Sequence, residues 1–103
     1  MDDVIKFSYN WNNKLNCKVY TTFRLFNEKY QYNKRYKIYL KEEHIHDAII
    51  EDMKIMKLDQ INRFIAGIDT GYSVKEFKNI VLKMYGEKAK TANFLFILLK
   101  KID

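Results

Sequence analysis

The sequence has no proline, only three glycines and one cysteine, and no long apolar run. So little proline and glycine excludes collagen-like, proline-rich and flexible-linker proteins. Cys17 has no internal disulfide partner, so we expect a reduced protein in which this thiol is a small buried hydrophobe. The longest apolar run, residues 94–99, is too short to span a bilayer, and the start MDDVIKF is acidic where a signal peptide is basic. These absences predict a soluble, cytoplasmic protein that does not enter a membrane.

The residues that are present predict one folded domain over residues 1–103. Apolar residues make up 48% of the chain and aromatic residues 16%, which is too much for a disordered protein. A chain of 103 residues can bury one modest core.

Positive charge is concentrated in the first part of the chain. Residues 1–41 hold nine Lys or Arg against three Asp or Glu, whereas residues 42–103 hold ten of each. Ten of the sixteen aromatic residues also lie within residues 1–41. Basic residues interleaved with rings suit a polyanion with exposed bases, because cations meet phosphates and rings stack on bases. The alternative is that most of these rings are core residues.

Alternating patterns predict strands early in the chain and at its end. We expect strands at VIKFSY (4–9), KVYTTFRL (18–25) and RYKIYLK (35–41), with a turn or short helical turn at NWNNKLNC (10–17). Residues 46–58 fit a strand or a helix; we favour a bulged strand, because isoleucine is β-branched and the preceding segments are strands. ANFLFILLKKI (92–102) predicts a central strand buried on both faces and inserted among the first strands.

Two segments between these strands have helical periodicity. In DQINRFIAGI the apolar residues Ile61, Phe64, Ile65 and Ile68 lie three or four apart. SVKEFKNIVLKMYG begins with the Ser73–Glu76 capping box and ends at Gly86. We expect its apolar stripe to be buried, with Lys75, Lys78 and Lys83 in water; the stripe consists of Val74, Phe77, Ile80, Val81 and Met84. The element order predicts a small α+β domain with a curled, mostly antiparallel sheet.

The segment KVYTTFRL places hydroxyls and an arginine among apolar residues. On a regular strand Val19, Thr21 and Phe23 share one face, which we expect to face the core. Tyr20, Thr22 and Arg24 share the other face, which offers a ring, a hydroxyl and a guanidinium. We expect this second face to line a site that holds a phosphate and a base.

Three segments in this order resemble a known family. KVYTTFRL is similar to a Lys–Thr–x–Thr–x–Arg signature, and DTGYSVKEFKNIVLKMYG is similar to an acid, glycine, aromatic and serine that precede a helix. Together with the closing apolar strand, they resemble the ASCH family over most of the chain. The resemblance implies a small PUA-like β-barrel with two packed helices, and a cleft between them that holds a nucleotide or RNA.

The resemblance also implies a catalytic site, since some small members hydrolyse acetylated cytidine with a lysine, a threonine and a glutamate, and others bind or cleave RNA. Anchored on Arg24, the family threonine falls on Thr22. The lysine position falls on Val19, one residue from Lys18, and the acid position on Thr70, one residue from Asp69. The implied catalytic residues are therefore Lys18, Thr22 and Asp69. A shift of one residue on a strand changes the face of a side chain unless a bulge corrects it.

Three functional hypotheses follow. The one we favour is an RNA- or nucleotide-binding module with a basic cleft beside residues 18–24; its binding residues would be Lys14, Lys18, Tyr20, Thr22, Arg24, Lys34 and Arg35. The second is an amidohydrolase acting on acetylated cytidine, or a ribonuclease, as the resemblance implies. The third is a module that binds an acidic protein partner through its basic face. None of these needs a cofactor.

Two further features have alternative explanations. His44 and His46 would share a strand face, as two metal ligands must, but there is no cysteine cluster and no H-E-x-x-H motif. We favour a solvated hairpin edge and no metal. Trp11 stands among polar neighbours, where it would either plug one end of a barrel or form a stacking platform at the mouth of the cleft.

Overall fold

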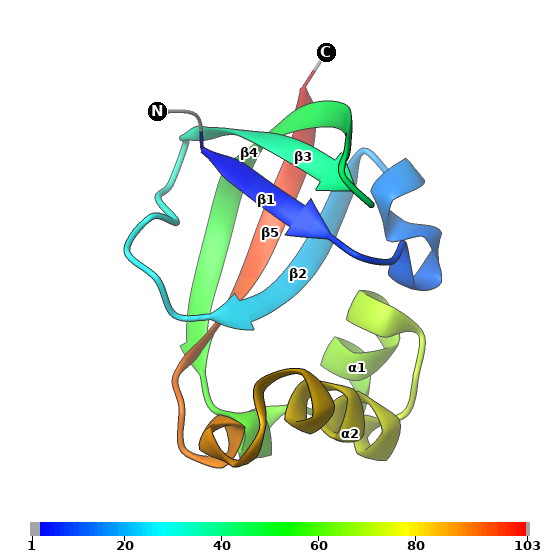
Figure 1. The fold of residues 1–103 in the computed structure, drawn as a ribbon, viewed down its shortest axis with the longest axis vertical. Coiled ribbons are helices and arrows are strands. Elements are labelled where there is room, and N and C mark those ends of the chain that lie inside the picture. Colours follow the sequence, from blue (N-terminus) through cyan, green and yellow to red (C-terminus); the bar gives the residue numbers. More distant parts are fainter. Residues whose placement is uncertain (1–2, 103) are drawn as a thin grey trace.

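A computed structural model describes residues 3–102 and has the α+β composition that the sequence predicts (Figure 1). The strands are β1 (Val4–Phe7), β2 (Val19–Leu25), β3 (Arg35–Leu40), β4 (Glu43–Met56) and β5 (Phe94–Ile102). The α-helices are α1 (Arg63–Thr70) and α2 (Val74–Tyr85), and short 3-10 helices are η1 (Trp11–Asn16), η2 (Leu58–Gln60) and η3 (Glu87–Lys90). Within these residues, no helix is long and apolar enough to cross a membrane.

The five strands form one curled sheet in the order β1-β3-β4-β5-β2. The last strand lies between β4 and β2, which confirms its predicted central position. Among the strand pairs of residues 3–102, β1 and β3 are parallel and the other pairs are antiparallel. The long β4 shifts register between Ile50 and Asp52, so the predicted bulged strand is also confirmed. β1 and β2 are the two sheet edges, and the curl of the sheet leaves a seam between them (Figure 1).

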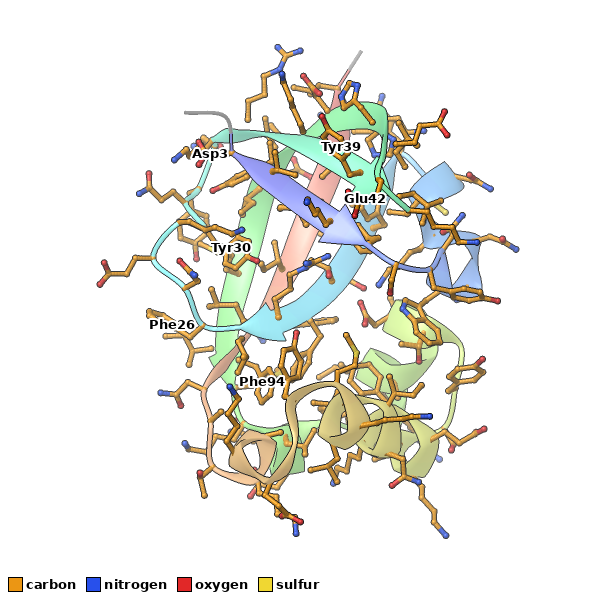
Figure 2. All side chains as sticks on the ribbon, in the orientation of Figure 1. Asp3, Phe26, Tyr30, Tyr39, Glu42 and Phe94 are labelled. Carbon is orange, nitrogen blue, oxygen red and sulfur yellow. The ribbon has the colours of Figure 1, made fainter. Side chains whose placement is uncertain are left out.

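The curled sheet forms a half-barrel, and its inner face carries the larger of two hydrophobic cores. Side chains from every strand contribute to it, among them Ile5, Tyr20, Ile38, Ile50 and Leu99. The smaller core lies between the helices and the end of the sheet that is lower in Figure 1, and includes Phe77, Val81 and Phe94. In Figure 2, Tyr30 lies beside the half-barrel, whereas Phe94 lies toward the helices. Along β5, Leu95, Ile97 and Leu99 are buried, but Phe96 and Leu98 are only half-buried. The prediction that both faces are buried therefore holds fully for the face of Leu95, Ile97 and Leu99, and on the other face only at Phe94.

Helix α2 begins where the sequence predicts. Ser73 Oγ accepts a hydrogen bond from the Glu76 N–H (3.2 Å), and Glu76 Oε1 accepts one from the Ser73 N–H (3.2 Å), so the capping box is formed. Phe77 and Val81 are buried, and Val74 and Ile80 are half-buried. Met84 is 59% exposed, so its predicted burial is wrong. It is not among the residues packed against the smaller core and instead lines the pocket described below.

Helix α1 faces the protein with its polar side. Phe64 and Ile68 are 69% and 59% exposed, whereas Ala66, Asp69 and Thr70 are buried. The apolar spacing predicted a helix, which is present at Arg63–Thr70, but the spacing does not mark the buried face at Phe64 and Ile68. The helix has only eight residues, so apolar periodicity constrains its rotation weakly. A rotation of α1 that buried Phe64 and Ile68 would turn Asp69 outward and break its buried contacts, which are described below.

Strand β2 separates two environments, with one face toward the half-barrel and the other toward the helices. Thr21 is buried and Phe23 packs against the smaller core, so these two face inward as predicted, on the side of the helices. The predicted burial of Val19 is wrong: it is 43% exposed at the start of the strand. The expected burial of Cys17 is also wrong, since it is exposed. Cys17 lies in the extended turn after η1, and Lys14 and Leu15 are the residues that this segment buries.

Candidate functional site

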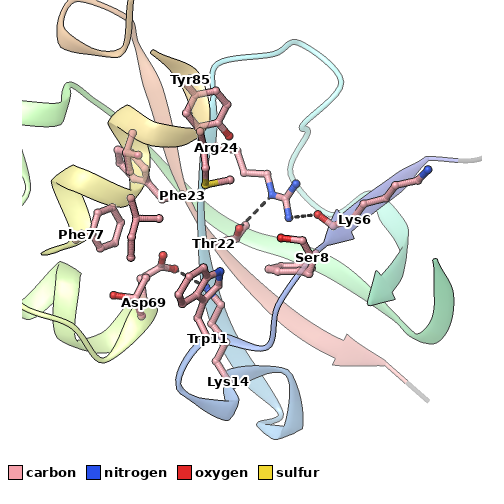
Figure 3. Close-up of a pocket in the computed structure, with 15 residues that line it drawn as sticks. Lys6, Ser8, Trp11, Lys14, Thr22, Phe23, Arg24, Asp69, Phe77 and Tyr85 are labelled. Atoms are coloured by element: carbon pink, nitrogen blue, oxygen red, sulfur yellow. Dashed lines mark hydrogen bonds and ion pairs between the residues drawn. The ribbon is translucent and has the colours of Figure 1, made fainter. Parts of the chain in front are cut away.

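A pocket lies at the seam, between the edges of β1 and β2 and under α2 (Figure 3). We call it the seam pocket; it holds about 590 Å³ of atom-free space, part of which is open to solvent. Its apolar wall comes mainly from α2, through residues such as Phe77 and Val81. Its polar and aromatic lining residues include Ser8, Trp11, Lys14, Thr22, Arg24, Asp69 and Tyr85. Mostly apolar walls with a few convergent polar groups are typical of small-molecule sites.

Arg24 bridges the seam. Its Nε donates to Thr22 Oγ1 (3.1 Å), and a terminal nitrogen donates to the Lys6 carbonyl oxygen on β1 (2.6 Å). The guanidinium carbon lies 4.5 Å from the centre of the Phe7 ring. Within residues 3–102, none of the ion pairs involves Arg24. The guanidinium is thus held in place by neutral groups, and its charge is not neutralised by a carboxylate of the described residues.

A buried cluster of three residues lies beside the seam pocket, and two of them, Lys14 and Asp69, line it. Lys14 Nζ donates to Asp69 Oδ1 at 2.8 Å, and Thr21 Oγ1 donates to the same oxygen at 2.8 Å. The side chains of Lys14 and Asp69 are 6% and 5% exposed. The three residues come from η1, β2 and α1, so the cluster ties these elements together. Thr22, the next residue on β2, points to the opposite strand face and lines the pocket with its hydroxyl.

Burial has a direct effect on Lys14. Loss of hydration is the largest influence on the pKa of its ammonium and lowers it; Asp69 opposes this shift and the nearby Arg24 charge adds to it. The net result is a pKa below the ordinary value of 10.5. A lysine with a lowered pKa gives up its proton more readily, which is what a general base requires.

The path of the chain through η1 explains how Lys14 reaches the pocket. Asn12 and Asn13 have φ of 55° and 54°, a left-handed conformation that asparagine tolerates better than most residues. The resulting kink turns the chain back on itself, and Asn12 Nδ2 donates to the Gly67 carbonyl oxygen of α1 (3.3 Å). Gly71 ends α1 with φ of 79°, beside the Asn12 side chain. The asparagine pair therefore docks η1 onto the end of α1.

The structure gathers some of the predicted site residues and separates others. Lys14, Thr22, Arg24 and Asp69 line the seam pocket. Lys18 is exposed, lies just before β2 and is not among the pocket residues. The lysine that contacts Asp69 is instead Lys14, which sequence reasoning proposed only for nucleic-acid binding. The sequence feature that could have indicated this role of Lys14 is the Asn12–Asn13 pair, since two adjacent asparagines favour a sharp turn of the chain just before Lys14.

The remaining predicted binding residues lie away from the pocket. Tyr20 is buried in the half-barrel, and its hydroxyl is 2.6 Å from His46 Nε2. Lys34 pairs with Asp3 (2.9 Å). Arg35 Nε pairs with Asp47 Oδ2 (2.7 Å) on the β3–β4 hairpin. These contacts do not form one continuous basic cleft with the pocket.

His44 and His46 have different partners. His44 is exposed and its Nε2 lies 2.7 Å from Asp47 Oδ1, whereas His46 contacts Tyr20. Burial lowers the pKa of His46, and the charge of Lys101 lowers it further. Residues 3–102 contain no group of three or more His, Cys, Asp or Glu side chains placed to hold a metal ion.

Comparison of the chain with family models, with curated proteins and with solved structures finds no match.

Proposed function

We propose that this protein is a nucleotide-binding module that holds a nucleotide, free or within RNA, in the seam pocket. The observation that carries the proposal is Arg24, whose guanidinium is fixed at the pocket wall without a carboxylate partner among residues 3–102. Its bonds to Thr22 and Lys6 and its contact with the Tyr30 side chain still leave N–H groups for a ligand, and a guanidinium fork matches the oxygens of a phosphate. Trp11 lines the same pocket and offers a ring to a base.

The resemblance to the ASCH family supports the same conclusion. It implies a PUA-like barrel with a nucleotide cleft between barrel and helices, and the seam pocket lies between the half-barrel and α2. The PUA-like assignment is part of this proposal. The basic residues outside the pocket, Lys18, Lys34 and Arg35, would at most attract RNA at long range, since Lys34 and Arg35 already pair with carboxylates.

Calorimetric titration with cytidine monophosphate tests this function. We expect saturable binding at low salt that weakens as salt rises, and about tenfold or greater loss in Arg24→Ala, because a hydrogen bond to a charged group contributes about 1.5–3 kcal/mol. Arg35→Ala is the matched control, since Arg35 is exposed and paired with Asp47 on the hairpin. Absent binding, or equal loss in both variants, would reject the proposal.

A second candidate, hydrolysis of acetylated cytidine, is favoured by the buried Lys14–Asp69–Thr21 cluster. A threonine hydroxyl, Thr22 in the pocket or Thr21 beside Asp69, would attack the acetyl carbon and pass its proton to Lys14 in the fraction of molecules in which this lysine has lost its own proton, which its lowered pKa increases. The C–N bond then breaks, cytidine leaves with that proton on its amine, and water hydrolyses the threonine ester to release acetate. A ribonuclease has no comparable support, because the pocket contains no histidine.

Conversion of N4-acetylcytidine to cytidine and acetate checks the second candidate. We expect turnover to be lost in Lys14→Met and in one of Thr21→Ala and Thr22→Ala, but kept in Lys18→Met, because Lys18 is exposed and outside the pocket. If the wild type shows no turnover, the hydrolase is rejected while nucleotide binding stands.

A further inference from the structure

Three aromatic rings form a row at the mouth of the seam pocket. The ring centres of Tyr9 and Trp11 are 4.7 Å apart, and those of Trp11 and Tyr72 are 5.7 Å apart, both edge to face. Trp11 lines the pocket, whereas Tyr9 and Tyr72 are 52% and 40% exposed. We call Tyr9, Trp11 and Tyr72 the aromatic row.

The row is not part of either hydrophobic core. None of its members belongs to the two buried clusters of the described chain, so core packing does not explain it. Two of its rings are held close together, because Trp11 opens η1 and Tyr72 follows Gly71, while Tyr9 contacts the ring of Trp11. The Lys14–Asp69 pair and the bond from Asn12 to the Gly67 carbonyl dock these two segments together. Rings fixed in this way lose little conformational freedom when a ligand binds.

The position of the row indicates what it binds. A mononucleotide with its phosphate at Arg24 needs one ring for its base, and Trp11 at the pocket wall supplies it. The two exposed rings on either side of Trp11 lie outside the pocket, where the neighbours of that nucleotide would continue along a strand. Fixed rings beside a cationic site are the combination by which proteins bind single-stranded nucleic acid.

We infer that the aromatic row is a base-stacking platform, so that the ligand is a nucleotide within single-stranded nucleic acid: its phosphate contacts Arg24 and its neighbouring bases stack on Tyr9 and Tyr72. This inference rests on the proposed nucleotide binding at the seam pocket. A duplex does not fit it, because paired bases are stacked on one another and do not offer free faces to the rings.

Trp11 is the only tryptophan of the chain, so its fluorescence reports binding at the row directly. We would titrate the wild type with cytidine monophosphate and with a short single-stranded oligocytidylate at one low salt concentration. We expect both to change Trp11 fluorescence, and the oligocytidylate to bind about tenfold tighter or more, because each stacked base adds to the affinity.

Two variants keep Trp11 and separate the row from the pocket. Tyr9→Ala and Tyr72→Ala are each expected to weaken oligocytidylate binding about fivefold or more and to leave cytidine monophosphate within about twofold. Tyr32→Ala is the matched control, because Tyr32 is 56% exposed and not part of the row. Circular dichroism checks that each variant is folded, and polyglutamate serves as a polyanion without bases.

The outcomes distinguish the two claims. If the oligocytidylate binds no tighter than the monophosphate, or if neither row variant weakens it more than Tyr32→Ala does, the stacking platform is wrong while nucleotide binding stands. If polyglutamate matches the oligocytidylate, the row binds no bases and the inference is overturned. If neither nucleotide ligand binds, both the inference and the proposed function fail.

Discussion

Lys14 and Asp69 are 55 positions apart in the sequence, and they meet as a buried ion pair with Nζ 2.8 Å from Oδ1. Burial of two charges costs hydration free energy, and only close contact and further hydrogen bonds offset that cost. The hydroxyl of Thr21 supplies one such bond to Asp69. The pair also sets the geometry of the seam pocket, since it holds η1 against α1 and thereby places Trp11 next to Tyr72.

Asp69→Asn should destabilise the protein by about 3–5 kcal/mol, because it leaves the buried Lys14 ammonium without a counter-charge. Urea denaturation measures this change. Glu87→Gln is the control, since Glu87 and Lys90 form an exposed pair that contributes about 1 kcal/mol or less. The double variant Lys14→Met, Asp69→Leu should recover much of the loss. If Asp69→Asn unfolds no more easily than Glu87→Gln, the buried pair is not formed.

The lowered pKa of Lys14 predicts a stability change in alkaline solution. Between the folded pKa and 10.5, the unfolded chain binds more protons than the folded one, so the free energy of unfolding due to this residue rises with pH. We therefore expect the wild type to gain stability relative to Lys14→Met as pH increases toward 10.5. Denaturation should be measured for both proteins across this pH range. The difference between them cancels the contribution of the tyrosines to the pH dependence, because the tyrosines titrate in both proteins. A constant or shrinking difference would contradict the lowered pKa.

Acid should weaken the fold through His46. Its pKa is lowered below 6.5 in the folded chain, chiefly by burial, so the unfolded chain takes up a proton first as pH falls. The free energy of unfolding should therefore decrease as pH falls from about 6.5 to the folded pKa of His46. Protonation also replaces the neutral ring that contacts the Tyr20 hydroxyl by a charged one. In His46→Gln this part of the decline should be absent, as melts from neutral to mildly acidic pH would reveal. An identical decline in both proteins would assign it to other groups.

The end of α1 depends on a left-handed glycine. Gly71→Ala should cost about 1–2 kcal/mol, because φ of 79° is unfavourable for a residue with a Cβ and the new atom would lie 3.2 Å from the Asn12 side chain. Gly67 is the matched control: it lies within α1, no atom lies within 4 Å of an added Cβ, and Gly67→Ala should stabilise by about 0.5–1 kcal/mol. Thermal melts of the two variants should shift in opposite directions; equal shifts would show that backbone conformation at Gly71 is not limiting.

Much of the fold follows from local patterns in the sequence. Alternation identified the strands, including the bulged β4, and the Ser73–Glu76 spacing identified the start of α2. These features depend on residues close in sequence, so a local pattern suffices to predict them. Thr22 and Arg24 were correctly expected to share a face of β2, because the strand is regular there.

Other features depend on contacts between distant residues. The rotation of α1, with Asp69 inward and Phe64 outward, accompanies an ion pair to a lysine 55 positions earlier. The site lysine was expected at Lys18, because the family resemblance placed it at Val19, one residue away, whereas the lysine beside Asp69 comes from η1, which kinks at Asn12 and Asn13. The alternation of residues along β2 could not predict the position of Lys14, because Lys14 lies outside this strand and reaches the pocket through the kink in η1.

The measurement that tests the account most directly is an NMR titration of the labelled protein with cytidine monophosphate. Trp11 has the only indole N–H of the chain, and the Arg24 side chain has its own Nε–H, so both walls of the seam pocket carry a resolved probe. We predict saturable shifts that are largest at these two groups and at the backbone of Thr22, with Arg35 on the hairpin unchanged. Shifts that do not saturate, or that are largest at Arg35 and its neighbours, would contradict nucleotide binding at the seam pocket.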